Sequence, residues 1–254
     1  MTDNKFENEL FSRKVIDNRI VSMTETLKYL LNKEEFRILD VAVGYFYISG
    51  LLLLKNEFTN FMDNRNGHFR ILMGNETNGA TVNVLDSGKY QNYAELIKAS
   101  TEKDTSNISD KEFLGKIAEW IKEGRIEVKV YTGTANYFHA KSYLFASSLN
   151  TGYGTAIVGS SNFSKSGLEG NTELNVLTQD GFFALHHWYN DLWLSKDEVT
   201  DFAPDLIKIA NDNGAKKTLQ QYKPVKETYY DFANIFAQPY AQLDTSKEWV
   251  KELF

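Results

Sequence analysis

The sequence predicts an α/β fold in which a mixed β-sheet is sandwiched between helices and is followed by a helical C-terminal extension. Three observations predict it. Apolar runs typical of strands alternate with helical patterns through the first 130 residues, strand-like runs then cluster between residues 139 and 178, and all three prolines fall in the last fifth of the chain. We therefore expect an α/β domain over residues 1–196 and a helical extension or connector over residues 197–254.

The first predicted elements follow the spacing of the apolar residues. Helical spacing over residues 12–31 predicts a first helix, and the Val- and Ile-rich run 37–46 predicts a buried strand. A largely apolar run that starts near Ser49 predicts a second helix, because it continues to Met62 with helical spacing. Residues 68–73 predict another strand, and the Gly-Asn pair after it indicates that a long polar loop begins there.

The next segment leads into the strand cluster. Residues 90–99 have a helical pattern, and the polar stretch 100–107 is the best candidate for a mobile insertion. Ser109 and Glu112 form a capping-box pair in front of a further helix, which a glycine at position 124 ends. Residues 126–131 then predict the strand that precedes the cluster.

An aromatic-rich segment after the strand cluster predicts a helix that packs on the sheet or on a partner chain, and core packing is the expected role. Its apolar members are Phe182, Phe183, Leu185, Trp188, Tyr189, Leu192 and Trp193. His186 and His187 are neighbours in this helix, and adjacent helical positions point about 100° apart. They therefore make a poor pair of metal ligands.

Composition limits the class of protein. The 254 residues, of which 42% are hydrophobic, suffice for a sizeable core. Without cysteine, disulfides and thiolate metal sites are excluded. The N-terminus does not resemble a signal peptide, and the longest apolar run, 48–54, is far short of the roughly 20 residues of a membrane span, so we expect a cytoplasmic protein without a membrane partner. The net charge of −6 argues against bulk electrostatic coating of nucleic acid, but it allows a local basic groove.

The strand cluster begins with an alternating run that contains His139 and Lys141. If this run is a strand, both polar side chains leave the same face of the sheet, because side chains alternate along a strand. A nucleophile then lies beside a fixed cation. The structural alternative is a solvated histidine with a chance lysine neighbour.

Two further runs complete the cluster. The apolar run 155–158 breaks at Gly-Ser-Ser-Asn, residues 159–162, and small residues at a strand end let backbone N–H groups approach an anion. The run 172–178 places Glu173 and Asn175 on one face if it is a strand. Together the three runs offer His, Lys, Asn and Glu side chains, which can grip and attack a phosphodiester.

This pattern resembles the phospholipase D superfamily, whose signature is H-x-K followed at a distance by G-S-x-N. The match comprises residues 139–141, residues 159–162 and the following Glu173. The sequence departs from the full motif at Ala146, where the family has an aspartate five positions after the lysine. The nuclease and restriction-endonuclease branch is similar in carrying a glutamate after the asparagine and in not always keeping that aspartate.

The resemblance implies a mechanism without metal or other cofactor. His139 would attack phosphorus to form a covalent phosphohistidine, a second histidine would protonate the leaving oxygen, and water would then release the product. Lys141 and Asn162 would hold the non-bridging oxygens and offset the charge of the transition state. Glu173 would orient the imidazole of His139 or of its dimer mate.

The serines of the second motif have two possible roles. Ser160 and Ser161 would donate hydrogen bonds to the phosphate if the resemblance extends to them. As turn residues that cap the next helix, they would have a structural role instead.

The chain has one H-x-K motif, because His68 is followed by Phe-Arg and no internal repeat is visible. Phospholipase-type members of the superfamily carry two copies of the motif and use both histidines. A complete site would therefore need a second subunit, and we expect a two-fold homodimer with a composite active site.

The expected function is that of a metal-independent phosphodiesterase acting on DNA, as the nuclease module of a restriction or helicase system. Similar sequence in bacterial helicases with an N-terminal phospholipase D-like domain runs on into motor domains, so fused helicase domains are also expected. The alternative is a nucleic-acid-binding or dimerisation module with little or no turnover. A lipid phosphodiesterase is disfavoured by the single motif and by the lack of an amphipathic membrane-binding stretch.

Overall fold

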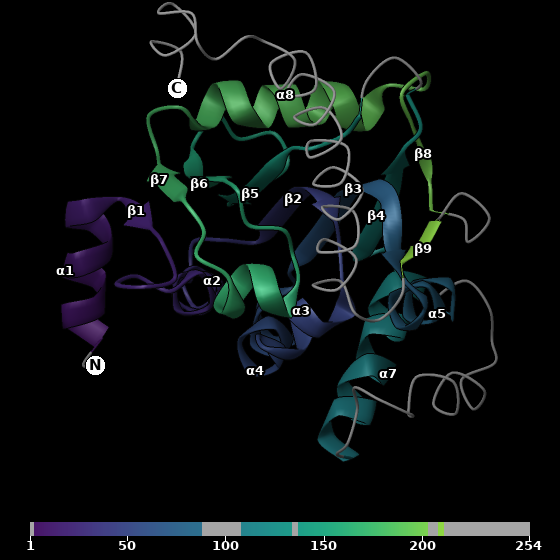
Figure 1. The fold of residues 1–254 in the computed structure, drawn as a ribbon, viewed down its shortest axis with the longest axis horizontal. Helices are drawn as coiled ribbons and strands as arrows, with labels where there is room; N and C mark the ends of the chain where they lie inside the picture. Colours follow the sequence, from purple (N-terminus) through teal and green to yellow (C-terminus); the bar gives the residue numbers. More distant parts are fainter. Residues whose placement is uncertain (1–2, 88–107, 134–136, 203–207, 211–254) are drawn as a thin grey trace, which may run out of the picture. The chain divides into compact units, whose positions relative to one another are not determined.

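The computed structural model describes residues 3–87, 108–133, 137–202 and 208–210 (Figure 1). Within these ranges nine strands form one mixed sheet in the order β1-β7-β6-β5-β2-β3-β4-β8, with β9 paired to β3. The strands are β1 (Val15–Ile16), β2 (Ile38–Tyr45), β3 (His68–Asn78), β4 (Ile126–Tyr131), β5 (Lys141–Ala146), β6 (Gly154–Gly159), β7 (Asn175–Thr178), β8 (Val199–Asp201) and β9 (Lys208–Ala210).

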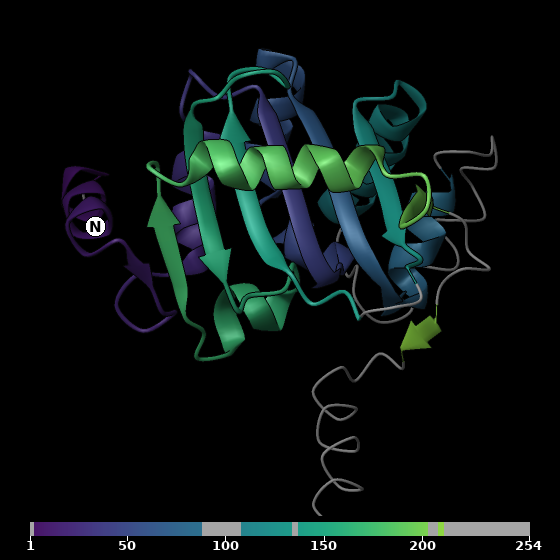
Figure 2. The ribbon, with the colours of Figure 1, turned by 90° about the horizontal axis from the view of Figure 1, so that it is seen from above.

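Helices cover both faces of the sheet, which confirms the predicted fold class. Their bounds are α1 (Asp3–Arg13), α2 (Met23–Leu31), α3 (Ile48–Leu52), α4 (Lys55–Thr59), the π-helix η1 (Asn60–Asn64), α5 (Gly79–Ser87), α7 (Ile108–Lys122), the π-helix η2 (Ser166–Gly170) and α8 (Phe182–Leu194). Figure 2 shows α8 crossing one face alone, with α2, α4 and α7 behind the opposite face. None of the helices in the described ranges is long and apolar enough to cross a membrane.

The central strand β2 is buried on both faces. Val41 and Val43 pack into the larger apolar cluster with α2, α4 and α7, while Ile38 and Ala42 pack into the cluster beneath α8. A continuous apolar run is the pattern expected of such a strand. The same burial explains the aromatic helix α8, whose Phe182, Tyr189 and Trp193 fill the second cluster and confirm the predicted core packing.

Strand directions bring one end of four strands together. β2 runs parallel to β3 and antiparallel to β5, and β5, β6 and β7 are successively antiparallel. In register, Val43 faces Lys141 and Gly159 faces Asn175. The C-terminal ends of β2 and β6 and the N-terminal ends of β5 and β7 therefore lie at the same edge of the sheet.

The predicted helix over residues 12–31 is wrong, because β1 and a turn separate α1 from α2. The Asp17 carboxylate accepts the backbone N–H of Ile20 at 2.8 Å, and Ser22 caps α2 by accepting the N–H of Glu25 at 3.3 Å. A side chain that captures nearby backbone donors offers an alternative to the helix. The apolar spacing was helical, but these polar residues divide it.

The polar loop predicted after residue 73 is also wrong. β3 continues to Asn78 because Glu76 still pairs with Tyr45 across a register shift in β2, and Thr77 donates its hydroxyl proton to the carbonyl of Phe46. Helix α5 follows directly.

Other predicted elements are confirmed or lie outside the described ranges. The helix after Ser49 is present as α3, α4 and η1, and residues 126–131 form β4 as predicted. Gly124 ends α7 with a φ of 70°, a left-handed conformation that favours glycine. The helix at 90–99, the insertion at 100–107 and nearly all of the helical extension lie outside the described residues. The extension's described residues, in β8 and β9, add strands to the sheet.

Candidate active site

The predicted catalytic residues gather at one edge of the sheet, but only Lys141 lies within a strand, since Asn162 follows the end of β6 and the other two precede strands. Lys141 is the first residue of β5, and His139 precedes the strand by two residues. The last β2–β5 pair is Val43 with Lys141, so position 139 has no partner in β2. Glu173 likewise precedes β7, which begins at Asn175.

Lys141 is a buried cation. Its residue is 6% exposed, and its Nζ donates to the backbone carbonyl of His139 at 2.9 Å. Burial lowers the pKa of Lys141 to about 8, while the carboxylate of Glu173 acts in the opposite direction. An anion bound here would supply the counter-charge that this lysine lacks.

Asn162 lies against the same point of β2 as the lysine. Its Oδ1 accepts the backbone N–H of Tyr45 at 3.1 Å, so Nδ2 is its donor atom. A Cβ on Gly44 would lie 3.3 Å from Asn162 Oδ1 and 3.7 Å from Lys141 Nζ. The bare backbone of Gly44 therefore allows the lysine and the amide to approach one another.

The Gly-Ser-Ser-Asn turn is held by a residue whose role sequence reasoning missed. Asn175 Oδ1 accepts the backbone N–H groups of Ser160 and Ser161, both at 3.1 Å, and its Nδ2 donates to Ser161 Oγ at 2.9 Å. A Cβ on Gly159 would lie 2.2 Å from the carbonyl oxygen of Leu174, so only glycine fits there. The sequence signal for the role of Asn175 was an asparagine in the strand segment that follows the glycine-serine turn.

The two serines have hydrogen bonds inside the turn. Ser160 donates its hydroxyl proton to the carboxylate of Glu173 and accepts the N–H of Leu174 at 3.0 Å. Asn175 accepts hydrogen bonds from the backbone N–H groups of both serines, so these two N–H groups already have a protein partner. Phosphate binding by Ser160 and Ser161 stays a prediction.

His139 is exposed beside an aromatic ring. The ring centroids of His139 and Tyr137 lie 5.8 Å apart. Desolvation by the surrounding protein and, next, the positive charge of Lys141 lower the pKa of His139. The imidazole is therefore mostly neutral at pH 7, as a nucleophile must be.

The charge of Glu173 acts on Lys141 and on two tyrosines, Tyr45 and Tyr143. Burial raises the pKa of the Tyr45 phenol; the contact with Asn162 opposes this rise, and the Glu173 carboxylate adds to it. Tyr143, whose hydroxyl donates to the carbonyl of Ser161 at 2.9 Å, has a pKa raised well above its usual value by burial and then by Glu173. Tyr45 was missed as a neighbour of the site, although the Tyr-Phe-Tyr triplet at residues 45–47 was visible in the sequence.

The helical histidines do not form a pair. His186 is buried, and its Nε2 lies 3.4 Å from Asp40 Oδ2, whereas the exposed His187 lies 3.4 Å from Asp191 Oδ2. Across the described ranges, no group of three or more His, Cys, Asp or Glu side chains is arranged to hold a metal ion.

Comparison with a family model gives a match over most of the chain. The family is described as "Cardiolipin synthase, PLD-like domain", and its model matches residues 39–193. No curated protein matches this sequence.

The chain is also similar to several solved structures at low identity. NucT from Helicobacter pylori has 14% identity and a TM-score of 0.40, with 71% of this chain and 92% of that chain covered. Nuc from Salmonella typhimurium, a phospholipase D family member, has 12% identity and a TM-score of 0.38, with coverages of 70% and 90%. Polyphosphate kinase from Porphyromonas gingivalis has 11% identity and a TM-score of 0.41, with coverages of 85% and 28%.

Proposed function

This chain belongs to the phospholipase D-like family, and from that premise we propose that it is a phosphodiesterase that cleaves DNA through a covalent bond between phosphorus and His139. One observation carries the proposal. At the edge of the sheet the buried cation of Lys141 donates to the backbone carbonyl of His139, lies beside the amide of Asn162 and helps to lower the pKa of the exposed His139 imidazole. A neutral nucleophile beside anion-binding donors is the arrangement that attack on a phosphodiester needs.

The proposed reaction has two steps. A ring nitrogen of His139 attacks phosphorus, the P–N bond forms, and the bond to the leaving oxygen breaks as a second histidine donates a proton. Water then attacks phosphorus as the second histidine takes its proton, the P–N bond breaks, and the neutral imidazole of His139 returns. Lys141 and the Nδ2 of Asn162 would hold the non-bridging oxygens, and each such donor contributes about 3 kcal/mol in comparable sites. No metal or cofactor takes part in this scheme.

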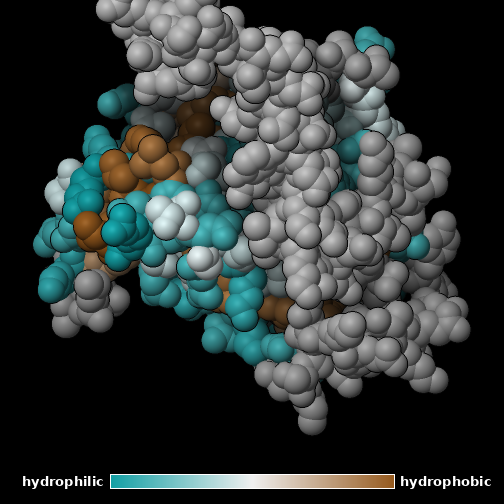
Figure 3. All heavy atoms as spheres, viewed as in Figure 1, coloured by the Kyte–Doolittle hydropathy of each residue, from teal (hydrophilic) through white to brown (hydrophobic). Residues whose placement is uncertain are grey.

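The second histidine would come from a second copy of the chain. An exposed apolar patch adjoins Glu173 and supports such an interface: Leu174 is 63% exposed, Val176 46% and Val158 36%. Figure 3 shows hydrophobic side chains over β1 and β7. A two-fold axis beside this patch would bring two H-x-K motifs into one composite site.

The alternative of a non-catalytic binding module rests on the missing motif aspartate. Ala146 is fully buried in the apolar cluster beneath α8 and is the last residue of β5. Lys141 is the first residue, and five steps along a strand span about 16 Å. The missing carboxylate therefore removes no group from the candidate site, which favours the enzymatic function.

The finer parts of the proposal rest on the resemblance to the nuclease and restriction branch. They are a DNA substrate, a restriction or helicase setting, and fused helicase domains. Glu173 supports them, since that branch carries a glutamate after the G-S-x-N motif.

The test is cleavage of plasmid and oligonucleotide DNA by the purified chain in EDTA. We expect cleavage to persist, and a covalent phosphoenzyme to be trapped after acid quenching. Activity that disappears in EDTA and returns with magnesium or zinc would contradict the phosphohistidine scheme. Sedimentation at micromolar concentration tests the dimer, and a monomer that still cleaves would contradict the composite site.

A further inference from the structure

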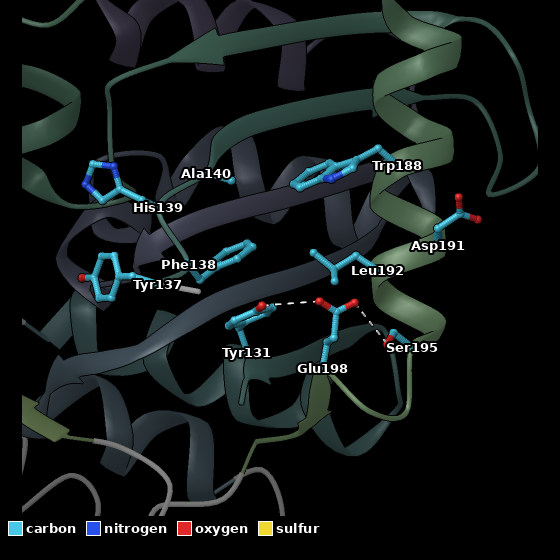
Figure 4. Close-up of a pocket in the computed structure, with 10 residues that line it drawn as sticks. All are labelled: Tyr131, Tyr137, Phe138, His139, Ala140, Trp188, Asp191, Leu192, Ser195 and Glu198. Carbon is cyan, nitrogen blue, oxygen red and sulfur yellow. Dashed lines mark hydrogen bonds between the residues drawn. The ribbon is translucent and has the colours of Figure 1, made fainter. Parts of the chain in front are cut away.

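A pocket of about 570 Å³ opens beside His139, between the segment 137–140 and helix α8. Its volume is typical of sites that bind small molecules or parts of larger ones. Figure 4 shows His139 at one end of the pocket, with Ser195 and Glu198 away from it near the C-terminal end of α8. The pocket can therefore hold the part of a substrate that adjoins the bond attacked by His139.

Aromatic rings form much of the pocket wall. Tyr131 and Phe138 stack with ring centroids 5.1 Å apart and planes inclined by 22°. Trp188 from α8 is 41% exposed, and Tyr137 is 69% exposed. Exposed rings beside a cavity provide flat apolar faces on which another ring can stack.

Two carboxylates, those of Asp191 and Glu198, line the pocket as hydrogen-bond acceptors. The Glu198 carboxylate accepts from Tyr131 OH at 3.4 Å and from Ser195 Oγ at 3.5 Å, and the exposed Asp191 also lines the wall. Among the described residues that line it, none is lysine or arginine. This chemistry disfavours a phosphate, but it suits the exocyclic amino groups of nucleobases, which donate to carboxylates.

We propose that this pocket holds an unpaired nucleobase next to the phosphodiester that His139 attacks. The inference rests on the proposed function and assigns its substrate: single-stranded nucleic acid or unpaired ends. A base inside a duplex is stacked and paired, so it must leave the duplex before it can enter a lateral pocket. The cation that binds phosphate, Lys141, and the rings that bind the base then serve different parts of one nucleotide.

The experiment measures binding without cleavage, in the full chain with His139→Asn as the common background. A single-stranded oligonucleotide carrying 2-aminopurine is titrated, and its fluorescence gives Kd. Trp188→Ala should raise Kd roughly 5- to 100-fold, the range found when a stacking residue is removed, and Trp188→Phe should keep most of the affinity. Phe183→Ala is the matched control, because Phe183 is an exposed aromatic of the same helix that does not line the pocket. It should change Kd less than twofold.

Equal effects of Trp188→Ala and Phe183→Ala, or none, would overturn the pocket assignment. Binding to vesicles that contain anionic phospholipid, lost in Trp188→Ala while oligonucleotide binding is kept, would overturn it in favour of a lipid ligand. Cleavage by the parent chain is measured separately. If the parent cleaves DNA while Trp188→Ala binds normally, the base pocket fails and the proposed function stands; if the parent cleaves none, the proposed function fails irrespective of the pocket.

Discussion

Two polar clusters of this protein differ in how their charges are balanced. The catalytic cluster comprises His139, Lys141, Asn162 and Glu173, and the core cluster beneath α8 comprises Asp40, Arg70, His186 and Asn190. In the core cluster, Arg70 binds Asp40 through two hydrogen bonds of 2.7 and 2.5 Å and Asn190 through a third of 2.9 Å. In the catalytic cluster, Lys141 donates to a carbonyl and, among the described residues, forms no ion pair.

The difference separates a structural role from a functional one. Arg70 also lies over the rings of Tyr189 and Trp193, at 5.1 and 5.3 Å from the guanidinium carbon, so its charge is enclosed on every side that the structure describes. Such a cluster has no capacity left for a ligand. The lysine, by contrast, is desolvated without a paired carboxylate, and strongly perturbed groups of this kind concentrate at functional sites.

The largest expected effect is on turnover. His139→Ala should lower DNA cleavage by at least about a thousandfold, because it removes the proposed nucleophile. The exposed side chain contributes little packing, so the free energy of unfolding should change by less than about 0.5 kcal/mol. Cleavage assays and urea unfolding measure the two effects. A variant that unfolds would show that His139 is structural.

The core cluster should respond in the opposite way. Asp40→Ala leaves Arg70 buried without its carboxylate, and it should lower the free energy of unfolding by about 3 to 5 kcal/mol. Glu9→Ala is the control, since it removes a surface ion pair with Arg13 that contributes at most about 1 kcal/mol. Activity per folded molecule should not change in Asp40→Ala. A stable but inactive Asp40→Ala variant would show that Asp40 takes part in the reaction, and the core cluster would then not be purely structural.

Lys141→Met should lower activity and raise stability together. Loss of a phosphate-binding cation should reduce kcat/KM by roughly a hundredfold. Each pKa unit corresponds to about 1.4 kcal/mol, so removal of the charge, whose pKa falls from 10.5 to about 8, should raise the free energy of unfolding by roughly 3 kcal/mol at pH 7. The unfolded chain keeps this proton up to about pH 10.5 and the folded chain only to about 8. The unfolded state thus binds more protons over this interval, and the advantage of the variant should shrink from pH 8 to 10.5.

A loss of stability in Lys141→Met would contradict the assignment of Lys141 as a desolvated cation. Urea unfolding at pH 7 and pH 10 measures the free energy of unfolding of the parent chain and the variant. The NMR titration of His139 in the same variant should show a higher pKa, because the charge of Lys141 helps to lower it.

The smallest expected effect is the pH dependence of kcat/KM. The rate should rise as the attacking His139 loses its proton, with a midpoint below the usual 6.5, and it should fall as the second histidine, which must be protonated to act as the acid, loses its own proton. Deprotonation of Lys141 near pH 8 should lower the rate further, so at pH 8.5 at most about a quarter of the maximum should remain. Glu173→Gln should move the basic limb to lower pH, since this carboxylate raises the pKa of Lys141, and it should reduce activity less than His139→Ala does. If the basic limb does not move in Glu173→Gln, Glu173 does not raise the pKa of Lys141 as expected.

Local pattern alone predicted the mixed α/β class, the central strand β2, the strand β4 and the buried helix α8. Each depends on the spacing of apolar residues over a few turns or strand steps, which burial on one or two faces imposes directly. The motif spacing also predicted His139, Lys141, Asn162 and Glu173 as neighbours, and the register places their segments at one edge of the sheet. The division of residues 12–31 depended instead on the local polar bonds of Asp17 and Ser22, which apolar spacing does not reveal.

Only the tertiary structure decided the electrostatic state of the site. The sequence by itself determined that a histidine and a lysine stand two positions apart, but the low pKa of Lys141 comes from burial beside β2, which outweighs the opposing charge of Glu173. The roles of Asn175 and of the pocket beside Trp188 likewise join segments that lie far apart along the chain. Desolvation and hydrogen bonding depend on which groups surround a side chain, and that neighbourhood exists only after the strands have paired.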